Sequence, residues 1–228
     1  FSMSDVMPRR PEPEAMDLAE EAHAYAAADF AEVNAAFVER LLYLTEDVPP
    51  RALTVDLGCG PGDIALRVGR ERPQWRIVAG DISMAMLSFA VARVREAGLR
   101  TCVWLVCQDA KRMPWPDGCF DVVFSNSLLH HLSDPVPFWN ELRRIAAPGA
   151  WVFFRDLARP ATETAAHMIV ACYAGGESNL LQEEYYRSLL AAYTPDEVRA
   201  QLRAAGLDNL SVEMASDRHL DIFGHLSA

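Results

Sequence analysis

Short apolar segments alternate with amphipathic segments through the middle of the chain, and this alternation restricts the fold more than any other feature. The apolar segments have the length of strands and are apolar on both faces: Leu53–Leu57, Arg76–Ala79, Thr101–Val106, Asp121–Ser125 and Trp151–Phe154. Strands buried on both faces are typical of parallel sheets covered by helices on both sides. We therefore predict an α/β fold with a Rossmann-like, doubly wound, mostly parallel sheet.

Helical spacing of apolar residues marks the segments before, between and after these strands. Helices are predicted over residues 14–47, Asp63–Glu71, Ser83–Ala97, Pro135–Ile145, Ala161–Tyr173 and Gln182–Ala192, and from Thr194 to Gly206. Two short strands are expected near residues 209–215 and 219–223. They would complete a seven-stranded sheet with an antiparallel carboxy-terminal strand, as is often attached to sheets of this kind.

The 228 residues, of which 51% are hydrophobic, are enough for one domain with a sizeable core. We predict that its parts share this core. They are residues 1–13, a tag remnant and flexible proline-rich terminus; residues 14–50, a helical lid; residues 51–157, the cofactor-binding core; residues 158–193, a helical insertion on the substrate side; and residues 194–228, a helix and the closing strands.

Charge and composition exclude several classes of function. The net charge of −11 disfavours bulk binding of nucleic acid. The apolar runs are far shorter than the ~20 residues that span a bilayer, and we expect no membrane association. The five cysteines lack metal-ligand spacing, so no metal site is predicted, and we expect reduced thiols in a cytoplasmic protein. The composition leaves a monomer or a homodimer open.

A glycine-rich turn follows the first predicted strand, at Gly58-Cys59-Gly60-Pro61-Gly62. Parallel α/β sheets bind ligands beyond the carboxyl ends of their strands, and glycines there let the backbone approach a ligand closely. The spacing is G-x-G-x-G, which differs from the G-x-G-x-x-G of dinucleotide-binding proteins and argues against a nicotinamide dehydrogenase. No lysine stands at the P-loop position, so a phosphate-binding loop is also disfavoured.

Polar residues follow the next three strands at their carboxyl ends. Asp81 ends the second strand, where its carboxylate could accept hydrogen bonds from both ribose hydroxyls. Asp109 and Ala110 end the third strand, where a carboxylate and an amide could bind an adenine ring. Asn126 and Ser127 end the fourth strand, next to the glycine turn. Together these residues predict a site for one extended ligand.

Four motifs in this order carry a family resemblance: D-L-G-C-G-P-G from Asp56, V-A-G-D ending at Asp81, Q-D-A at residues 108–110, and F-S-N-S-L-L-H-H-L-S-D-P from Phe124. Residues 53–157 thereby resemble the class I S-adenosylmethionine-dependent methyltransferases, of the small-molecule, methyltransferase type 11-like group. The resemblance implies S-adenosylmethionine as cofactor. The residues it implies for binding are Asp56, Gly58, Cys59, Gly60 and Gly62 for the methionine part, Asp81 for the ribose, Ile82, Met86, Asp109 and Ala110 for the adenosine, and Asn126, Ser127 and Tyr25 around the methionine and the lid.

The chemistry of this family is an in-line displacement at a sulfonium methyl group, in which the protein mainly positions the reactants. A general base is needed only if the acceptor must lose a proton. His130 and His131 directly follow the fourth strand, and imidazole titrates near neutrality. Either histidine is a candidate base or substrate-orienting residue, with His131 favoured, and the alternative is that both residues fix the loop.

Candidates for acceptor binding come from three segments. They are Phe30 and Asn34 in the lid, Arg155 after the fifth strand, and Tyr185 in the insertion. Two of them have a structural alternative: a helical core stripe for Phe30, and an Arg–Asp pair for Arg155. The predicted function is methyl transfer to a small molecule. A methyltransferase acting on a protein or RNA, and a non-catalytic S-adenosylmethionine-binding subunit, remain as alternatives.

Overall fold

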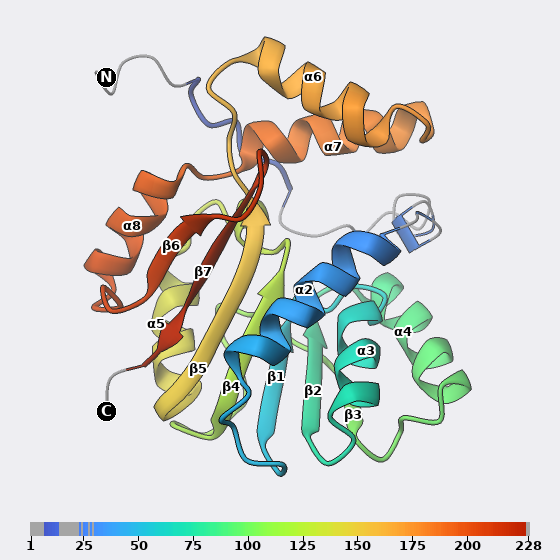
Figure 1. Cartoon of the computed structure of the whole chain (residues 1–228), viewed down its shortest axis with the longest axis vertical. Coiled ribbons are helices and arrows are strands. Elements are labelled where there is room, and N and C mark those ends of the chain that lie inside the picture. The colour runs from blue at the N-terminus through green and yellow to red at the C-terminus, as the bar shows by residue number, and fades with distance from the viewer. Residues whose placement is uncertain (1–6, 14–22, 24, 27, 29, 227–228) are drawn as a thin grey trace.

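A computed structural model describes residues 7–13, 23, 25–26, 28 and 30–226. They form a seven-stranded sheet with the order β3-β2-β1-β4-β5-β7-β6 (Figure 1). The strands are β1 (Leu53–Leu57), β2 (Arg76–Asp81), β3 (Val103–Cys107), β4 (Phe120–Asn126), β5 (Ala146–Leu157), β6 (Ser211–Met214) and β7 (His219–His225). Within this sheet β7 runs antiparallel to both of its neighbours, β5 and β6, and all other pairings are parallel. The predicted fold class is confirmed.

Helices cover both faces of the sheet. They are α2 (Ala31–Leu44), α3 (Asp63–Glu71), α4 (Met84–Glu96), α5 (Val136–Ile145), α6 (Glu163–Ala174), α7 (Asn179–Ala191) and α8 (Pro195–Ala204), with a 3-10 turn η1 (Leu129–His131). One face packs against α2, α3 and α4, and the opposite face packs against α5 and α8. Alternate side chains of each strand therefore enter different cores, as the two-sided apolar strands predicted.

The predicted helical range of residues 14–47 is interrupted before α2. Residues 14–22 lie outside the described residues, His23, Tyr25 and Ala26 are helical, Ala28 is in a bend, and α2 begins at Ala31, after Phe30 with its non-helical backbone. From there α2 packs on the sheet, where the ring of Phe37 stacks on Phe153 with 4.7 Å between centroids. Residues 31–44 are therefore part of the core.

The fifth strand is longer than predicted. Pro148 and Gly149 were expected only to end the preceding helix, but β5 already begins at Ala146, where α5 ends. A register shift against β4 and a positive φ of 79° at Gly149 make room for these two residues inside the strand. At its other end β5 continues to Leu157 and carries Arg155 and Asp156 into the site described below.

Helices α6 and α7 pack together beyond the carboxyl ends of the strands, beside residues 7–13 (Figure 1). The backbone N–H groups of Met7 and Arg10 donate to the carbonyls of Ala161 (3.1 Å) and Leu190 (3.0 Å). These hydrogen bonds join residues 7–13 to the insertion. Among the described residues, no helix has the length and apolar character to cross a membrane.

Candidate cofactor and acceptor site

The glycine turn after β1 is held by backbone geometry that glycine adopts easily. Gly58, Gly60 and Gly62 have φ values of 70°, 51° and 84°, in the left-handed region. The N–H groups of Gly58 and Cys59 both donate to the carbonyl of Gly80, each over 2.9 Å. The turn is thereby fixed to the end of β2, which accounts for the G-x-G-x-G spacing without reference to a ligand.

Asp56 is buried below this turn, and its Oδ2 has no hydrogen-bond partner in the structure. Burial and, to a smaller extent, the charge of Asp81 raise the pKa of Asp56 to about 8, against a weaker opposing effect of the Ala65 N–H. An unpartnered buried carboxyl group is costly for a folded protein. A cationic group bound beside it would supply the missing partner.

Asp81, at the end of β2, is already engaged by the backbone. Its Oδ2 accepts from the N–H of Gly60 over 2.7 Å, and its Oδ1 accepts from the N–H of Ser83 over 2.8 Å. Burial raises the pKa of Asp81, and these two N–H groups oppose the shift. The carboxylate keeps free acceptor positions, since each of its oxygens can accept a second hydrogen bond.

A cavity of about 450 Å³ opens between the glycine turn and the lid segment. It brings together eight of the predicted site residues: Asp56, Gly58, Cys59, Gly60, Asn126, Tyr25, Phe30 and Asn34. The rings of Tyr25 and Phe30 lie 4.8 Å apart at their centroids, and Asn34 Nδ2 donates to Asp63 Oδ2 over 2.8 Å. Residues from three distant parts of the chain thus enclose one space at the carboxyl ends of β1 and β4.

The residues predicted for the adenosine do not line this cavity. Asp109 Oδ1 accepts from the backbone N–H of Lys111 over 2.8 Å, which fixes the end of β3 beside Ala110. Ile82 has an exposed side chain, whereas Met86 is buried on α4. Gly62 and Ser127 also lie outside the lining, Gly62 as the N-cap of α3.

The end of β4 has a strained backbone. Ser127 has a φ of 62°, the only positive value at a residue other than glycine among the described residues. Its N–H donates to the carbonyl of Arg155 over 2.9 Å, and Ser125 Oγ donates to the carbonyl of Leu57 over 2.6 Å. Strain held by neighbouring strands is frequent at functional sites, and here it directs the chain from Asn126 toward the two histidines.

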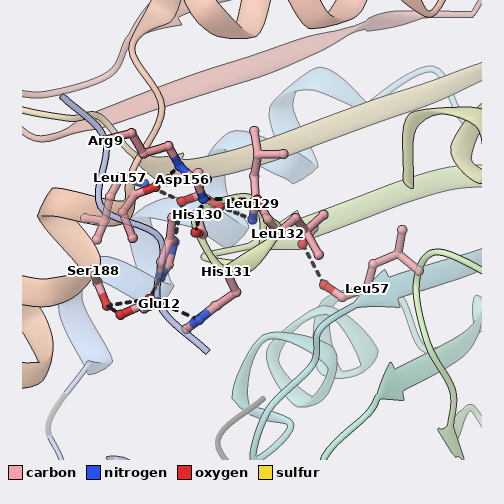
Figure 2. A network of polar contacts seen from close by, with 12 residues as sticks. Arg9, Glu12, Leu57, Leu129, His130, His131, Leu132, Asp156, Leu157 and Ser188 are labelled. Carbon is pink, nitrogen blue, oxygen red and sulfur yellow. Dashed lines mark hydrogen bonds and ion pairs between the residues drawn. The ribbon is translucent and has the colours of Figure 1, made fainter. Parts of the chain in front are cut away.

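His130 is buried and fixed from the side of β5 (Figure 2). Its Nδ1 lies 2.6 Å from Asp156 Oδ1, and Asp156 also accepts from the N–H groups of Leu129 (2.6 Å) and Leu157 (2.7 Å). Burial would lower the pKa of His130, but the adjacent Asp156 carboxylate raises it above its ordinary value. For Asp156, burial is outweighed by His130 and the two N–H groups, so its pKa is lowered.

His131 turns to the amino-terminal segment (Figure 2). Its Nδ1 lies 3.1 Å from Glu12 Oε1, and Ser188 Oγ of α7 donates to the same oxygen over 3.1 Å. Arg9, from the same segment, donates to the carbonyl of His130 over 2.8 Å. Glu12 and Arg9 were not predicted as site residues, because residues 1–13 read as a flexible terminus. Their only sequence signal is two charged residues in a proline-rich stretch.

Arg155 and Tyr185, both predicted to face the acceptor, have protein partners. Arg155 Nε and Nη2 donate to Asp221 Oδ1 and Oδ2 over 2.7 and 2.8 Å. Arg155 is therefore paired with an acid, as the structural alternative expected, but the acid is Asp221 of β7 and not the adjacent Asp156, which contacts His130. Tyr185 packs against the α6–α7 core, and burial raises its pKa to about 12. The neighbouring Tyr186 stacks on His167 instead.

The sheet order, the glycine turn on β1 and the acid ending β2 define a class I methyltransferase fold. Residues 55–154 match the family model described as a methyltransferase domain. With the solved structures below, this match shows that residues 55–154 are similar to a methyltransferase domain and that the chain has the fold of the class I S-adenosylmethionine-dependent methyltransferases.

Curated relatives match between half and about 70% of the chain. A malonyl-[acyl-carrier protein] O-methyltransferase of Legionella pneumophila is 35% identical over 55% of this chain and 42% of its own length. A 27-O-demethylrifamycin SV methyltransferase of Amycolatopsis mediterranei is 28% identical over 71% and 56%. A ubiquinone/menaquinone biosynthesis C-methyltransferase of Desulfotalea psychrophila is 33% identical over 50% and 44%. The chain thus spans about half the length of these relatives.

Solved structures extend the likeness to the whole fold. A S-adenosylmethionine-dependent methyltransferase from Aquifex aeolicus superposes with a TM-score of 0.67 at 18% identity, over 90% of this chain and 98% of that one. A phosphoethanolamine N-methyltransferase of Haemonchus contortus in complex with S-adenosyl-L-methionine gives 0.66 at 16% identity, over 90% and 56%. At these identities the likeness establishes the fold, and the residue roles rest on the geometry above.

Proposed function

We propose that this protein transfers a methyl group from S-adenosylmethionine to a small-molecule acceptor by in-line displacement. The observation that carries the proposal is the unpartnered Oδ2 of Asp56 at the bottom of the cavity beside the glycine turn. The α-ammonium group of the cofactor's methionine part is a partner of the required charge. Bound there, the cofactor would supply the activated methyl group and the thioether leaving group.

The rest of the cofactor is assigned to neighbouring strand ends. Asp81 would hold the ribose with the acceptor positions that the backbone leaves free. Ile82, exposed next to it, would pack on the adenine, and Asp109 with Ala110 would bind the adenine edge. Asn126 and Tyr25 line the cavity on its other sides and would enclose the methionine part. Gly62 and Ser127 support this site through the backbone turns they form, and Met86 supports it from the core of α4.

The acceptor is assigned to the space between the carboxyl end of β4 and the lid segment. His130 is held by Asp156 and is buried, so His131 is the histidine proposed to orient the acceptor or to remove its proton. Phe30 and Asn34 would contact the acceptor or the cofactor from the lid. A small molecule is favoured over RNA by the net charge of −11 and by the small size of the α6–α7 insertion.

The proposal is tested in two steps. Calorimetry with S-adenosylmethionine and S-adenosylhomocysteine should show binding of both, and failure to bind either would overturn it. An isotopically labelled methyl donor is then incubated with the protein and fractionated metabolite extracts, and labelled products are identified by mass spectrometry. Label in a small molecule is expected. Label found only in protein or RNA would favour a methyltransferase that acts on a macromolecule. Cofactor binding with no labelled product would favour a non-catalytic S-adenosylmethionine-binding subunit.

His131 is tested with a matched control. His131→Ala should lower the turnover of the labelled product much more than the affinity for S-adenosylhomocysteine. His167→Ala, an exposed histidine on α6, should change neither. Equal turnover in the His131→Ala variant and the unchanged protein would contradict a role in the acceptor site.

A further inference from the structure

Three potential metal-ligand atoms converge where the amino-terminal segment meets η1. Glu12 Oε1 lies 3.5 Å from His130 Nε2 and 3.1 Å from His131 Nδ1. All three ligand atoms lie within 4.8 Å of one another, and Figure 2 shows them turned toward a common centre. The proposed methyl transfer does not require Glu12, so this arrangement needs a separate explanation.

Asp156 prepares His130 for this role. It occupies Nδ1 of the ring at 2.6 Å, so Nε2 is the nitrogen that faces Glu12. Metal-binding histidines commonly donate their other ring N–H to a carboxylate, which fixes the tautomer and the ring orientation. Asp156 is itself held by two backbone N–H groups, so the His130 ring is positioned from β5 without any ligand.

His131 supplies a second, independent observation. Its Nδ1 is buried and has no hydrogen-bond partner, and its contact with Glu12 Oε1, 3.1 Å away, is an ion pair only when the ring is protonated. A buried ring nitrogen without a partner calls for an explanation. An ion between the imidazole nitrogen and the carboxylate would satisfy both groups at once.

The distances fit a small divalent ion. Zinc binds imidazole nitrogen at about 2.0–2.1 Å and carboxylate oxygen at about 2.0–2.2 Å, so tetrahedral ligands lie about 3.3 Å apart. The measured separations of 3.1 and 3.5 Å lie on either side of this value. Two imidazoles and one carboxylate suit zinc and similar transition metals better than magnesium or calcium, which prefer oxygen ligands.

We propose that Glu12, His130 and His131 form a binding site for one divalent transition-metal ion, with zinc as the best match. The side chains of His131 and Glu12 remain partly exposed, which leaves a fourth position for water or an acceptor oxygen. The ion would fasten residues 7–13 to the end of β4. No metal site was predicted from the spacing of the cysteines, and Glu12 is remote from the histidine pair in the chain, so no local motif marks this cluster.

Binding is tested on the full chain without an affinity tag, after treatment with a chelator. Calorimetric titration with Zn²⁺ should give one site per chain. Titration with Co²⁺ should give visible d–d absorption without the thiolate charge-transfer bands that binding at the exposed Cys107 or Cys172 would produce. Thiolate bands or the absence of binding would overturn the proposal.

Two variants locate the ion. Glu12→Gln and His131→Ala should each weaken Zn²⁺ binding at least tenfold, whereas the matched surface variants Glu183→Gln and His167→Ala should leave it unchanged.

Thermal unfolding with and without Zn²⁺ gives a second readout. The ion should raise the Tm of the parent protein and of the two control variants, and should not raise the Tm of Glu12→Gln or His131→Ala. Unchanged Zn²⁺ affinity in folded Glu12→Gln and His131→Ala would show that the cluster is an ion-paired polar network. Donor binding is measured separately, so failure here leaves the proposed methyl transfer standing.

Discussion

The backbone N–H of Gly60 donates a hydrogen bond to Asp81 Oδ2 over 2.7 Å, so the turn after β1 is built partly on the acid that ends β2. Asp81 Oδ1 accepts from the N–H of Ser83 at the start of α4. The residue assigned to the ribose therefore also organises the two backbone segments on either side of it. Its substitution should disturb the turn as well as the direct contact with the cofactor.

Asp81→Ala should weaken the affinity for S-adenosylhomocysteine by about 10- to 100-fold. Hydrogen bonds to a charged group contribute about 1.5–3 kcal/mol, and about 1.4 kcal/mol corresponds to a factor of ten. Calorimetry measures the effect, with Asp208→Ala, an exposed acid in the loop before β6, as the control. Unchanged affinity in a folded Asp81→Ala protein would remove the ribose assignment.

Asp56 should make folding stability depend on pH. Its pKa is raised from 3.8 to about 8 in the folded protein, so folding favours its protonated form. The stability that this form provides is complete below pH 4 and is lost as the pH rises toward about 8, with a slope of at most about 1.4 kcal/mol per pH unit. Asp56→Asn should lack this pH dependence. Urea unfolding of the parent and the variant at a series of pH values measures it, as a pH-dependent difference between their free energies of unfolding.

The same carboxyl group should release a proton when the cofactor binds. At pH 7 Asp56 is mostly protonated, and pairing with the ammonium group of S-adenosylhomocysteine requires the carboxylate. Calorimetry in buffers with different ionisation enthalpies should show release of up to one proton per site. Asp56→Asn should bind more weakly and release none. Identical binding enthalpies in all buffers for the parent protein would contradict the ammonium assignment.

Position 80 has no room for a side chain, because the Gln108 side chain packs against the backbone of Gly80. A Cβ at this position would lie 2.2 Å from Gln108 Nε2, and Gln108 is held by the hydrogen bond from Trp115 Nε1 to its Oε1, 2.7 Å long. Gly80→Ala should therefore cost about 1–3 kcal/mol of stability, as overpacked cores do. Gly176→Ala is the control, since nothing lies within 4 Å of its added Cβ. The double variant Gly80→Ala/Gln108→Ala should recover part of the loss in urea unfolding, and equal stability of the Gly80→Ala and parent proteins would rule out the contact.

The sheet could be predicted from the sequence because each strand is a short apolar run between a helix and a polar residue. This local pattern also placed Asp56, Gly58, Gly60 and Asn126 around one cavity, since parallel strands end at the same edge. Contacts between distant segments have no such pattern. Glu12 meets His131, and Arg155 meets Asp221, only because residues 7–13 and β7 return to the same edge of the sheet. The length of β5 escaped prediction for a related reason, since its partner β4 determines where pairing begins.

Arg155 is expected to stabilise the fold rather than to bind the acceptor. It lies directly opposite Asp221 in the β5–β7 register, and the bidentate pair is largely buried, with 15% and 6% of the two side chains exposed. Removing one partner leaves the other charge buried and unpaired, which costs about 3–5 kcal/mol. Arg155→Ala and Asp221→Ala should each show this loss in urea unfolding. The double variant should lose much less stability than the sum of the two single losses. As a control, the exposed pair Arg187 and Glu183 should give a coupling energy below about 1 kcal/mol.

The affinity of these Arg155 and Asp221 variants for S-adenosylhomocysteine should stay within about twofold of the parent protein, because neither residue lines the cavity. Full stability of Arg155→Ala combined with lost methyl transfer would instead return Arg155 to the acceptor site.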